Sequence, residues 1–326
     1  MGNLRRERDI FQELAGKSRF GTRQSLAPMQ SRAPLRSLSS EWSTKFRSYF
    51  KLNLVLEINH PALFCSMEAN NWKEAKAILD RWVRICNHPK FIPSDPISIP
   101  HLFSQKEDIE IAALFSALLA WGQRGSMLKK LHNLMDRMDM APLDFILHHK
   151  STDLIRLEGF VHRTFNDTDL LYLISFLKTI YENEGSLEKA FFPEPDKSMD
   201  AVYQAFIRFR KRFVSLEDFP KRSGKHVASP ERGSACKRLN MLLRWMVRKD
   251  DAGVDFGLWQ SILPAQLICP CDVHVERQAR ILGLVSRPKA DWKMAEELTQ
   301  NLRLMDAADP VRYDFALFGM GVGLHE

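Results

Sequence analysis

Long apolar runs are missing from this 326-residue sequence. The longest, from Ile109 to Trp121, has 13 residues (121 − 109 + 1) and includes Glu110, whereas about 20 apolar residues are needed to span a bilayer. The first residues, MGNLRR, are charged and precede no apolar stretch, which is unlike a secretory signal. The sequence therefore predicts no membrane-spanning helix, no membrane partner and no secretion.

Cysteine is also scarce. The chain has five cysteines, an odd number for its length, and this argues against a framework of disulfide bonds. Proteins with free thiols are typical of reducing compartments. We therefore expect a cytoplasmic protein.

Acidic residues are almost absent from one segment, residues 221–249. Nine lysines and arginines stand there against the single acid Glu231, a local net charge of +8 (9 − 1). The net charge of +7 for the whole chain comes mostly from residues 1–50, with ten basic and four acidic residues. The local segment, and not the total charge, thus indicates a possible phosphate-binding surface.

The rest of the chain shows helical periodicity and no strand pattern. Residues 1–66 are rich in Arg, Ser and Gln and predict a disordered extension, which is a gene-start artefact if translation begins at Met67. From residue 67 to 326 apolar residues recur at helical spacing, separated by short loops. We expect an all-α fold, with helices over residues 273–283 and 291–305 near its end.

The segment from Lys237 predicts an amphipathic helix. Leu239, Leu242, Leu243 and Met246 recur at helical spacing and form the expected buried stripe. Lys237, Met241, Arg244 and Arg248 fall on the opposite side, which we expect to be a basic, exposed face. Lys237 begins this helix, where the positive helix terminus and neighbouring cations favour a nucleophilic amine; an ordinary surface lysine is the alternative.

Asp272 follows a Pro-Cys pair and precedes a second helix. It has three interpretations: a helix N-cap, part of a metal site with Cys269, Cys271 and His274, or half of a catalytic pair. The cysteine and histidine spacing offers too few ligands for a typical zinc site. The glycine-rich GMGVG near the C-terminus follows no strand and precedes no helix, so a nucleotide loop is not expected there.

Three segments together resemble the helix-hairpin-helix DNA glycosylase superfamily. LFSALLAWGQR (Leu114–Arg124) is similar to its early apolar helix, ACKRLNMLLRWMVR to the helix that presents a lysine, and CDVHVERQARILGL to its aspartate motif. Residues 75–322 also resemble an uncharacterised bacterial family of conserved hypothetical proteins, on HPKFIPSDPISIPHLF, HRTFNDTDLLY, KRLNMLLRWMVR and DPVRYDFALFG. That second resemblance implies no activity.

The glycosylase resemblance implies a DNA repair enzyme with two helical lobes and a central cleft. Lys237 would be the nucleophile that forms a Schiff base with the sugar of a damaged nucleotide, and Asp272 would activate it. The substrate would be an oxidised purine in double-stranded DNA, flipped out of the helix, and a lyase step would follow. The DNA-contacting residues would be Gln123, Arg124, Gly233, Ser234, Arg238, Arg244, Arg248, His274 and Arg277. The resemblance further implies a monomer of the bacterial nucleoid.

The sequence departs from the superfamily in its hairpin. PERGSACK (Pro230–Lys237) replaces the usual L-P-G-x-G, and Lys237 lies 35 residues before Asp272 (272 − 237). This longer gap is similar to the archaeal 8-oxoguanine glycosylase branch. No four-cysteine cluster is present at the C-terminus, so we expect no iron–sulfur cofactor, and no metal or other cofactor. The alternatives are a catalytically silent DNA- or RNA-binding protein on the same scaffold and a helical protein-interaction module.

Overall fold

The structure is a computed structural model that describes residues 71–323, of which residues 73–323 belong to one compact unit. The extension predicted for residues 1–66 lies outside the described residues. The longer helices are α3 (Asn71–Cys86), α4 (Lys106–Leu119), α5 (Arg124–Arg137), α7 (Asp167–Glu184), α9 (Ala201–Phe213), α10 (Lys237–Val247), α11 (Val273–Ile281), α12 (Trp292–Met305) and α13 (Tyr313–Val322). Shorter α-helices are α6 (Pro142–His148) and α8 (Leu187–Phe191).

The predicted all-α fold is confirmed, with one small addition. Strands β1 (Val161–His162) and β2 (Phe165–Asn166) pair antiparallel, and Val161 lies opposite Asn166. Two residues a strand are too few to give an alternating pattern, which is why the sequence did not predict this hairpin. None of the described helices has the length and apolarity needed to cross a bilayer.

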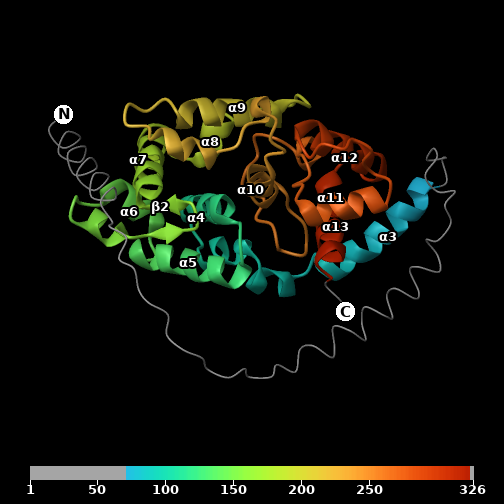
Figure 1. Cartoon of the computed structure of the whole chain (residues 1–326), viewed down its shortest axis with the longest axis horizontal. Coiled ribbons are helices and arrows are strands. Elements are labelled where there is room, and N and C mark those ends of the chain that lie inside the picture. Colours follow the sequence, from blue (N-terminus) through green and yellow to red (C-terminus); the bar gives the residue numbers. More distant parts are fainter. Residues whose placement is uncertain (1–70, 324–326) are drawn as a thin grey trace, which may run out of the picture. The chain divides into compact units, whose positions relative to one another are not determined.

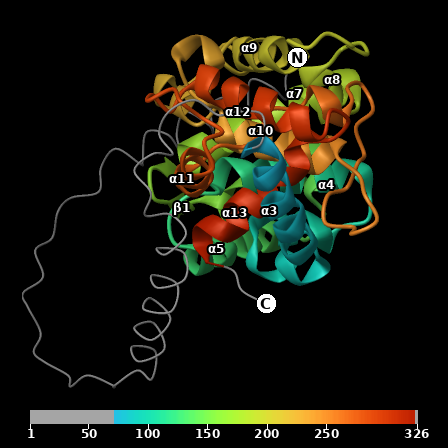
Figure 2. The ribbon, with the colours of Figure 1, turned by 90° about the vertical axis from the view of Figure 1, so that its right-hand side faces the viewer.

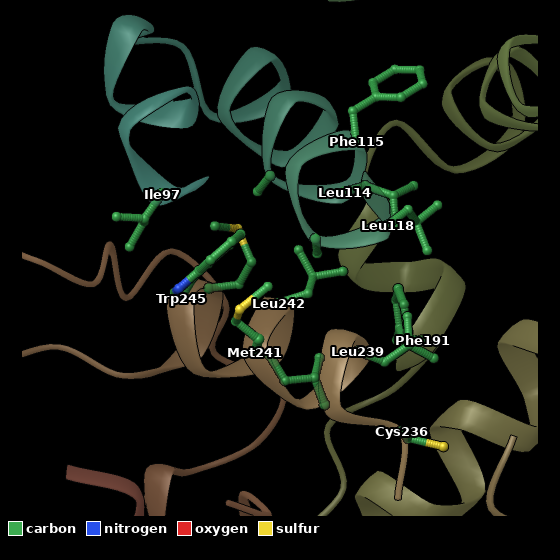
Figure 3. Close-up of a cluster of buried hydrophobic side chains, with 14 of the residues drawn as sticks. Ile97, Leu114, Phe115, Leu118, Phe191, Cys236, Leu239, Met241, Leu242 and Trp245 are labelled. Carbon is green, nitrogen blue, oxygen red and sulfur yellow. The ribbon is translucent and has the colours of Figure 1, made fainter. Parts of the chain in front are cut away.

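Helix α4 is the centre of the core. Its side chains are buried without interruption from Ile109 to Leu119, as expected for a helix that other elements surround on all sides. Figure 3 shows Leu114 and Leu118 of α4 facing Leu239 and Leu242 of α10, and these two helices pack closely along their length. Burial of these apolar side chains contributes about 1.5–3 kcal/mol for each residue.

The buried carboxylate of Glu110 is surrounded by donors. It accepts hydrogen bonds from Tyr181 Oη (2.8 Å), Ser186 Oγ (2.9 Å), the Leu187 amide (2.9 Å) and Trp259 Nε1 (2.8 Å). These donors come from α7, the start of α8 and a loop after α10. The one acidic residue in the longest apolar run therefore joins three parts of the fold, since a buried charge is tolerated when it is fully hydrogen-bonded.

Helix α10 lies between two groups of helices. Figure 1 shows α4 to α9 on one side of α10 and α11 to α13 on the other. In Figure 2, the view from the second side, α11, α13 and α3 lie in front of α10. Tyr313 of α13 links to α3, because its hydroxyl donates to Asp80 (3.1 Å) and accepts from Lys76 Nζ (3.3 Å).

Helices α11 and α13 pack closely at a single glycine. A methyl group on Gly321 would lie 2.7 Å from His274 Cβ and 3.0 Å from the His274 carbonyl oxygen, which is closer than van der Waals contact. The GMGVG segment is thus mostly part of α13, where Gly321 permits close helix packing. It is no phosphate loop, in agreement with the sequence prediction.

Candidate active site

Lys237 is placed at the start of α10 by an irregular loop. Pro230–Arg232 form one turn of 3₁₀ helix, Gly233 follows with φ +73°, and Cys236 holds the left-handed conformation with φ +51°. Left-handed backbone is unfavourable for a residue with a side chain. A hydrogen bond from the Cys236 amide to Ser234 Oγ (3.1 Å) and burial of the Cys236 side chain stabilise it. This loop occupies the position of the predicted hairpin.

Asp272 is both a helix cap and a partner of Lys237. Its Oδ1 accepts hydrogen bonds from the amides of His274 (2.9 Å) and Val275 (3.0 Å), which caps α11. Its Oδ2 lies 3.9 Å from Lys237 Nζ. The side chains remain 29% and 20% exposed, so both are accessible to a ligand.

A cavity of about 210 Å³ adjoins this pair. Its walls come from segments far apart in the sequence: the loop before α4, the connection from α4 into α5, the starts of α10 and α11, and α13. Trp121, Met127, Met241 and Phe318 supply apolar surface, and Lys237 and Asp272 face the same space. The pair therefore lies in a recess with both apolar and charged walls, as is typical of binding sites for small groups.

Two further carboxyl groups line the cavity. Asp314 is 5% exposed, and burial raises its pKa to about 6, although the nearby Arg244 opposes this shift. Burial also raises the pKa of Asp95, whose Oδ1 accepts a hydrogen bond from the Ile97 amide (3.1 Å). The charge of Lys237 acts on both carboxyls, so the amine lies within an acidic surrounding of three aspartates.

The prediction that the basic face of α10 is exposed is wrong. Met241, Arg244 and Arg248 are 7%, 4% and 2% exposed, because α10 is covered on both sides. Arg244 forms ion pairs with Asp255 (3.3 Å) and Asp314, and its guanidinium lies 4.3 Å from the Phe315 ring centroid.

Arg248 is buried among carboxylates in the same way. It forms ion pairs with Asp250 (2.6 Å), Asp255 (3.0 Å) and Asp309 (2.8 Å). The charges of Arg244 and Arg248 are therefore neutralised by aspartates and stabilise the fold, which argues against the predicted contacts with DNA phosphates, although Arg244 also lines the Lys237–Asp272 cavity.

The other predicted DNA contacts are distributed around the cavity. Arg124 and His274 line it, and Arg124 lies over the Phe318 ring at 5.5 Å. Gln123 is exposed at the N-cap position of α5, outside the cavity wall. Arg277 donates to the Gly321 carbonyl (2.5 Å), which also receives a hydrogen-bond contact from His274 Nδ1 (3.1 Å). Both side chains thus also hold α11 against α13.

The loop before α10 contains Gly233 and Ser234, and Arg238 is the second residue of α10. Gly233 is exposed, whereas Ser234 and Arg238 are half-buried. Arg238 donates to the Leu118 carbonyl (2.5 Å), and Ser234 and Arg238 line a second, basic cavity. These residues are therefore separated from the Lys237–Asp272 cavity, although Arg238 is the next residue after Lys237.

Asp314 is the site residue that sequence reasoning missed. It lies in the apolar segment YDFALFGMGV, where an isolated acid among buried residues was the available signal. Its role depends on Arg244, 70 residues away in the chain (314 − 244), and that pairing is visible only in three dimensions.

Within residues 71–323 the structure groups no three histidine, cysteine or acidic side chains as a metal site. Cys269 and Cys271 are buried, and the Cys271 thiol donates to the Cys269 carbonyl (3.3 Å). His274 is turned to Gly321. Of the three interpretations of Asp272, the helix cap is confirmed, and the pairing with Lys237 coexists with it.

Comparison with known proteins places the chain in one family. No curated protein matches it, and no solved structure matches it. Residues 95–323 match the family described as protein of unknown function (DUF2400). That range covers well over half of the chain and includes every residue of the Lys237–Asp272 cavity except Phe91. The chain therefore belongs to the DUF2400 family.

Proposed function

We propose that this protein is a DNA glycosylase with lyase activity that removes an oxidised purine through a Schiff base on Lys237. The observation that carries the proposal is the 3.9 Å pairing of Lys237 Nζ with Asp272 Oδ2. The two residues lie 35 positions apart in sequence (272 − 237) and meet in one recess. An amine beside a carboxylate at the mouth of a cavity is an arrangement suited to covalent catalysis.

In the proposed reaction Asp272 Oδ2 accepts a proton from Lys237, and the free amine attacks C1′ of the flipped nucleotide. The bond from C1′ to the base breaks, and the base leaves with the electron pair and takes up a proton. Opening of the sugar ring gives the iminium on Lys237. Loss of a proton from C2′ then expels the 3′ phosphate, and water releases the sugar from the enzyme. The reaction uses water and no oxidant or cofactor.

The surroundings of the pair agree with this chemistry. Asp272 Oδ1 is occupied by the two amides that cap α11, which holds Oδ2 in a fixed position toward Lys237. The apolar side chains Trp121, Met127 and Phe318 offer surface for a flipped base. Arg124 lines the same cavity and carries no ion pair with a carboxylate in the described residues, so it can meet a phosphate.

Borohydride trapping tests the proposal directly. The protein is incubated with duplexes that carry 8-oxoguanine, uracil or an abasic site, and borohydride then reduces any iminium to a stable amine. We expect a covalent adduct with an oxidised purine that is absent in Lys237→Ala. Asp272→Asn retains the capping oxygen, and we expect adduct formation to slow by about 10²–10⁴-fold, the range for loss of a general base. Lys249→Gln, which changes an exposed lysine after α10, is the matched control.

A catalytically silent DNA- or RNA-binding protein is the second candidate. The same 3.9 Å ion pair favours it, since a lysine that pairs with a capping aspartate also stabilises the junction of α10 and α11. This candidate predicts salt-dependent binding that Lys237→Ala leaves unchanged, with no adduct and no base release on any duplex. That result would replace the enzyme proposal.

A further inference from the structure

We infer that a second cavity, on the other side of the loop before α10, is a binding site for a phosphate group. This cavity has a volume of about 540 Å³ and is lined by five cationic side chains: Arg210, Lys221, Lys225, Arg232 and Arg238. No carboxylate lines it. The site is independent of the chemistry proposed for Lys237, and either proposal can fail alone.

The five cations of this cavity are not neutralised by contacts with acidic side chains of residues 71–323. None of the five forms an ion pair with a carboxylate there, although the buried Arg244 and Arg248 each pair with two or more. Arg210 and Arg238 are half-buried, and their guanidinium groups donate only to carbonyl oxygens, among them Gly224 and Leu118. One chain thus contains a neutralised cluster of cations and a cluster that is not neutralised.

This difference has an energetic cost that a ligand would remove. Burial lowers the pKa of Arg210 and of Arg238, and Arg232 lowers the pKa of Arg210 further. A partly buried cation beside another cation is destabilising unless an anion is near. The arrangement therefore favours a bound anion over an empty cavity.

The shape and polarity of the cavity point to phosphate. Arginine forks and lysine ammonium groups together match a group with several anionic oxygens. Ser229 Oγ, in the cavity wall, is buried and has no hydrogen-bond partner in the described residues. A phosphate oxygen would satisfy this hydroxyl as well as the cations.

The position of the cavity links it to the candidate active site. Lys237 lines one cavity and Arg238, the next residue, lines the other. A nucleic-acid strand could therefore place a backbone phosphate here while another nucleotide occupies the Lys237 cavity. Free phosphate, or the phosphate of a small metabolite, has the same chemistry.

The test compares the full-length protein with the double variant Lys225→Gln/Arg232→Gln. Both residues are exposed at the rim, so their replacement leaves the core intact, and the thermal midpoint without ligand checks this. Lys211→Gln removes one positive charge from an exposed site beside Arg210 that does not line the cavity. Duplex DNA binding is measured over a range of salt, and thermal midpoints are measured with sodium phosphate and with sodium chloride at equal ionic strength.

We expect the double variant to bind duplex DNA about tenfold more weakly or worse, with a salt slope smaller by about 1–2, because each lost phosphate contact releases one counterion fewer. Lys211→Gln should stay within about twofold of the wild type. If sodium phosphate also raises the midpoint of the wild type but not of the double variant, free phosphate is sufficient as a ligand. If only DNA distinguishes the proteins, the source is a backbone phosphate.

Equal behaviour of the double variant and Lys211→Gln with both ligands would overturn the site. Borohydride trapping on Lys237 is a separate readout. An adduct without a phosphate effect leaves the proposed function standing and removes this site, and the opposite result does the reverse.

Discussion

The ion pairs of Arg244 show how one residue determines the stability of the candidate site. Its guanidinium forms ion pairs with two buried aspartates, Asp314 of α13 and Asp255 of the loop after α10. Asp255 also pairs with Arg248, whereas Asp314 forms an ion pair with Arg244 alone among the described residues. The burial of Arg244 is therefore tolerated because its partners are also buried.

Arg244→Met should lower the free energy of unfolding by about 3–5 kcal/mol, because two carboxylates lose a buried partner. Urea unfolding followed by circular dichroism measures the change. Lys249→Met, a substitution at an exposed position just after α10, should change stability by no more than about 0.5 kcal/mol. A stable Arg244→Met protein that has lost only nucleic-acid affinity would contradict the structural role.

Asp314 should give the protein a specific pH dependence. Its pKa is about 6 in the folded protein and about 4 in an unfolded chain. Between these values the folded state holds a proton that the unfolded state has released, so the free energy of unfolding falls as pH rises from about 4 to 6.

Asp314→Asn removes this titration. The difference in unfolding free energy between wild type and variant should therefore change across pH 4–6, in the sense that the wild type loses more stability with rising pH, by at most about 3 kcal/mol. Denaturant unfolding at pH 4.5, 5.5 and 7 measures it. A difference that is constant over this range would show that Asp314 titrates normally.

At the scale of elements, caps and close contacts decide where the helices lie. Asp272 and Asp291 cap α11 and α12, because their carboxylates accept hydrogen bonds from the amides of His274 (2.9 Å) and Met294 (3.1 Å). The close approach of α11 to α13 depends instead on Gly321, where a side chain would clash with His274. Since Asp272 begins α11, this contact also determines where Asp272 lies relative to Lys237.

Gly321→Ala should destabilise the protein by about 1–3 kcal/mol, because the new methyl group meets the His274 backbone of α11. It should also reduce any Lys237-dependent adduct, because α11 and with it Asp272 must move. Thermal unfolding and borohydride trapping measure the two effects. Gly125→Ala is the matched control: it lies in α5 with open space around it, so alanine should be neutral or stabilising by up to about 1 kcal/mol. Equal effects of both substitutions would contradict the packing argument.

At the scale of the molecule, the described cysteines report on global opening. Cys86, Cys236, Cys269 and Cys271 are all buried, and burial raises the pKa of Cys86 to about 11 and of Cys236 to about 12. The thiols of Cys86 and Cys236 are therefore protonated at neutral pH, and burial makes all four cysteines inaccessible to a reagent in the folded protein.

In a Cys65→Ser variant, which removes the one cysteine outside the described residues, the four remaining thiols should react with a disulfide reagent only on unfolding. Labelling at pH 8 should thus be slow without denaturant and should accelerate in parallel with the loss of helical signal. Rapid modification of one thiol in the native protein would reveal local opening near that cysteine, and mass spectrometry of the labelled protein identifies it.

Much of the fold follows from the sequence alone. Helical periodicity, with Asp272 as a cap, is sufficient for the all-α class and for the positions of α11 and α12 to within two residues, because these signals act within a few residues of one another. The motif resemblance also anticipated that Lys237 and Asp272 would lie close together, and they are 3.9 Å apart. Their catalytic role remains a prediction.

Tertiary structure alone decided the role of the basic residues after residue 220. A helical pattern shows which face of α10 is apolar, but it does not show that Arg244 and Arg248 on the other face meet four aspartates up to 70 positions away. Nor does it show that Arg210 and Arg238 are left without such partners. Charge in a sequence is a sum over neighbours in the chain, whereas its energy depends on neighbours in space and on burial. Of the nine basic residues that predicted one phosphate surface, Arg244 and Arg248 are therefore neutralised in the core, whereas four others line the second cavity without a carboxylate partner: Lys221, Lys225, Arg232 and Arg238.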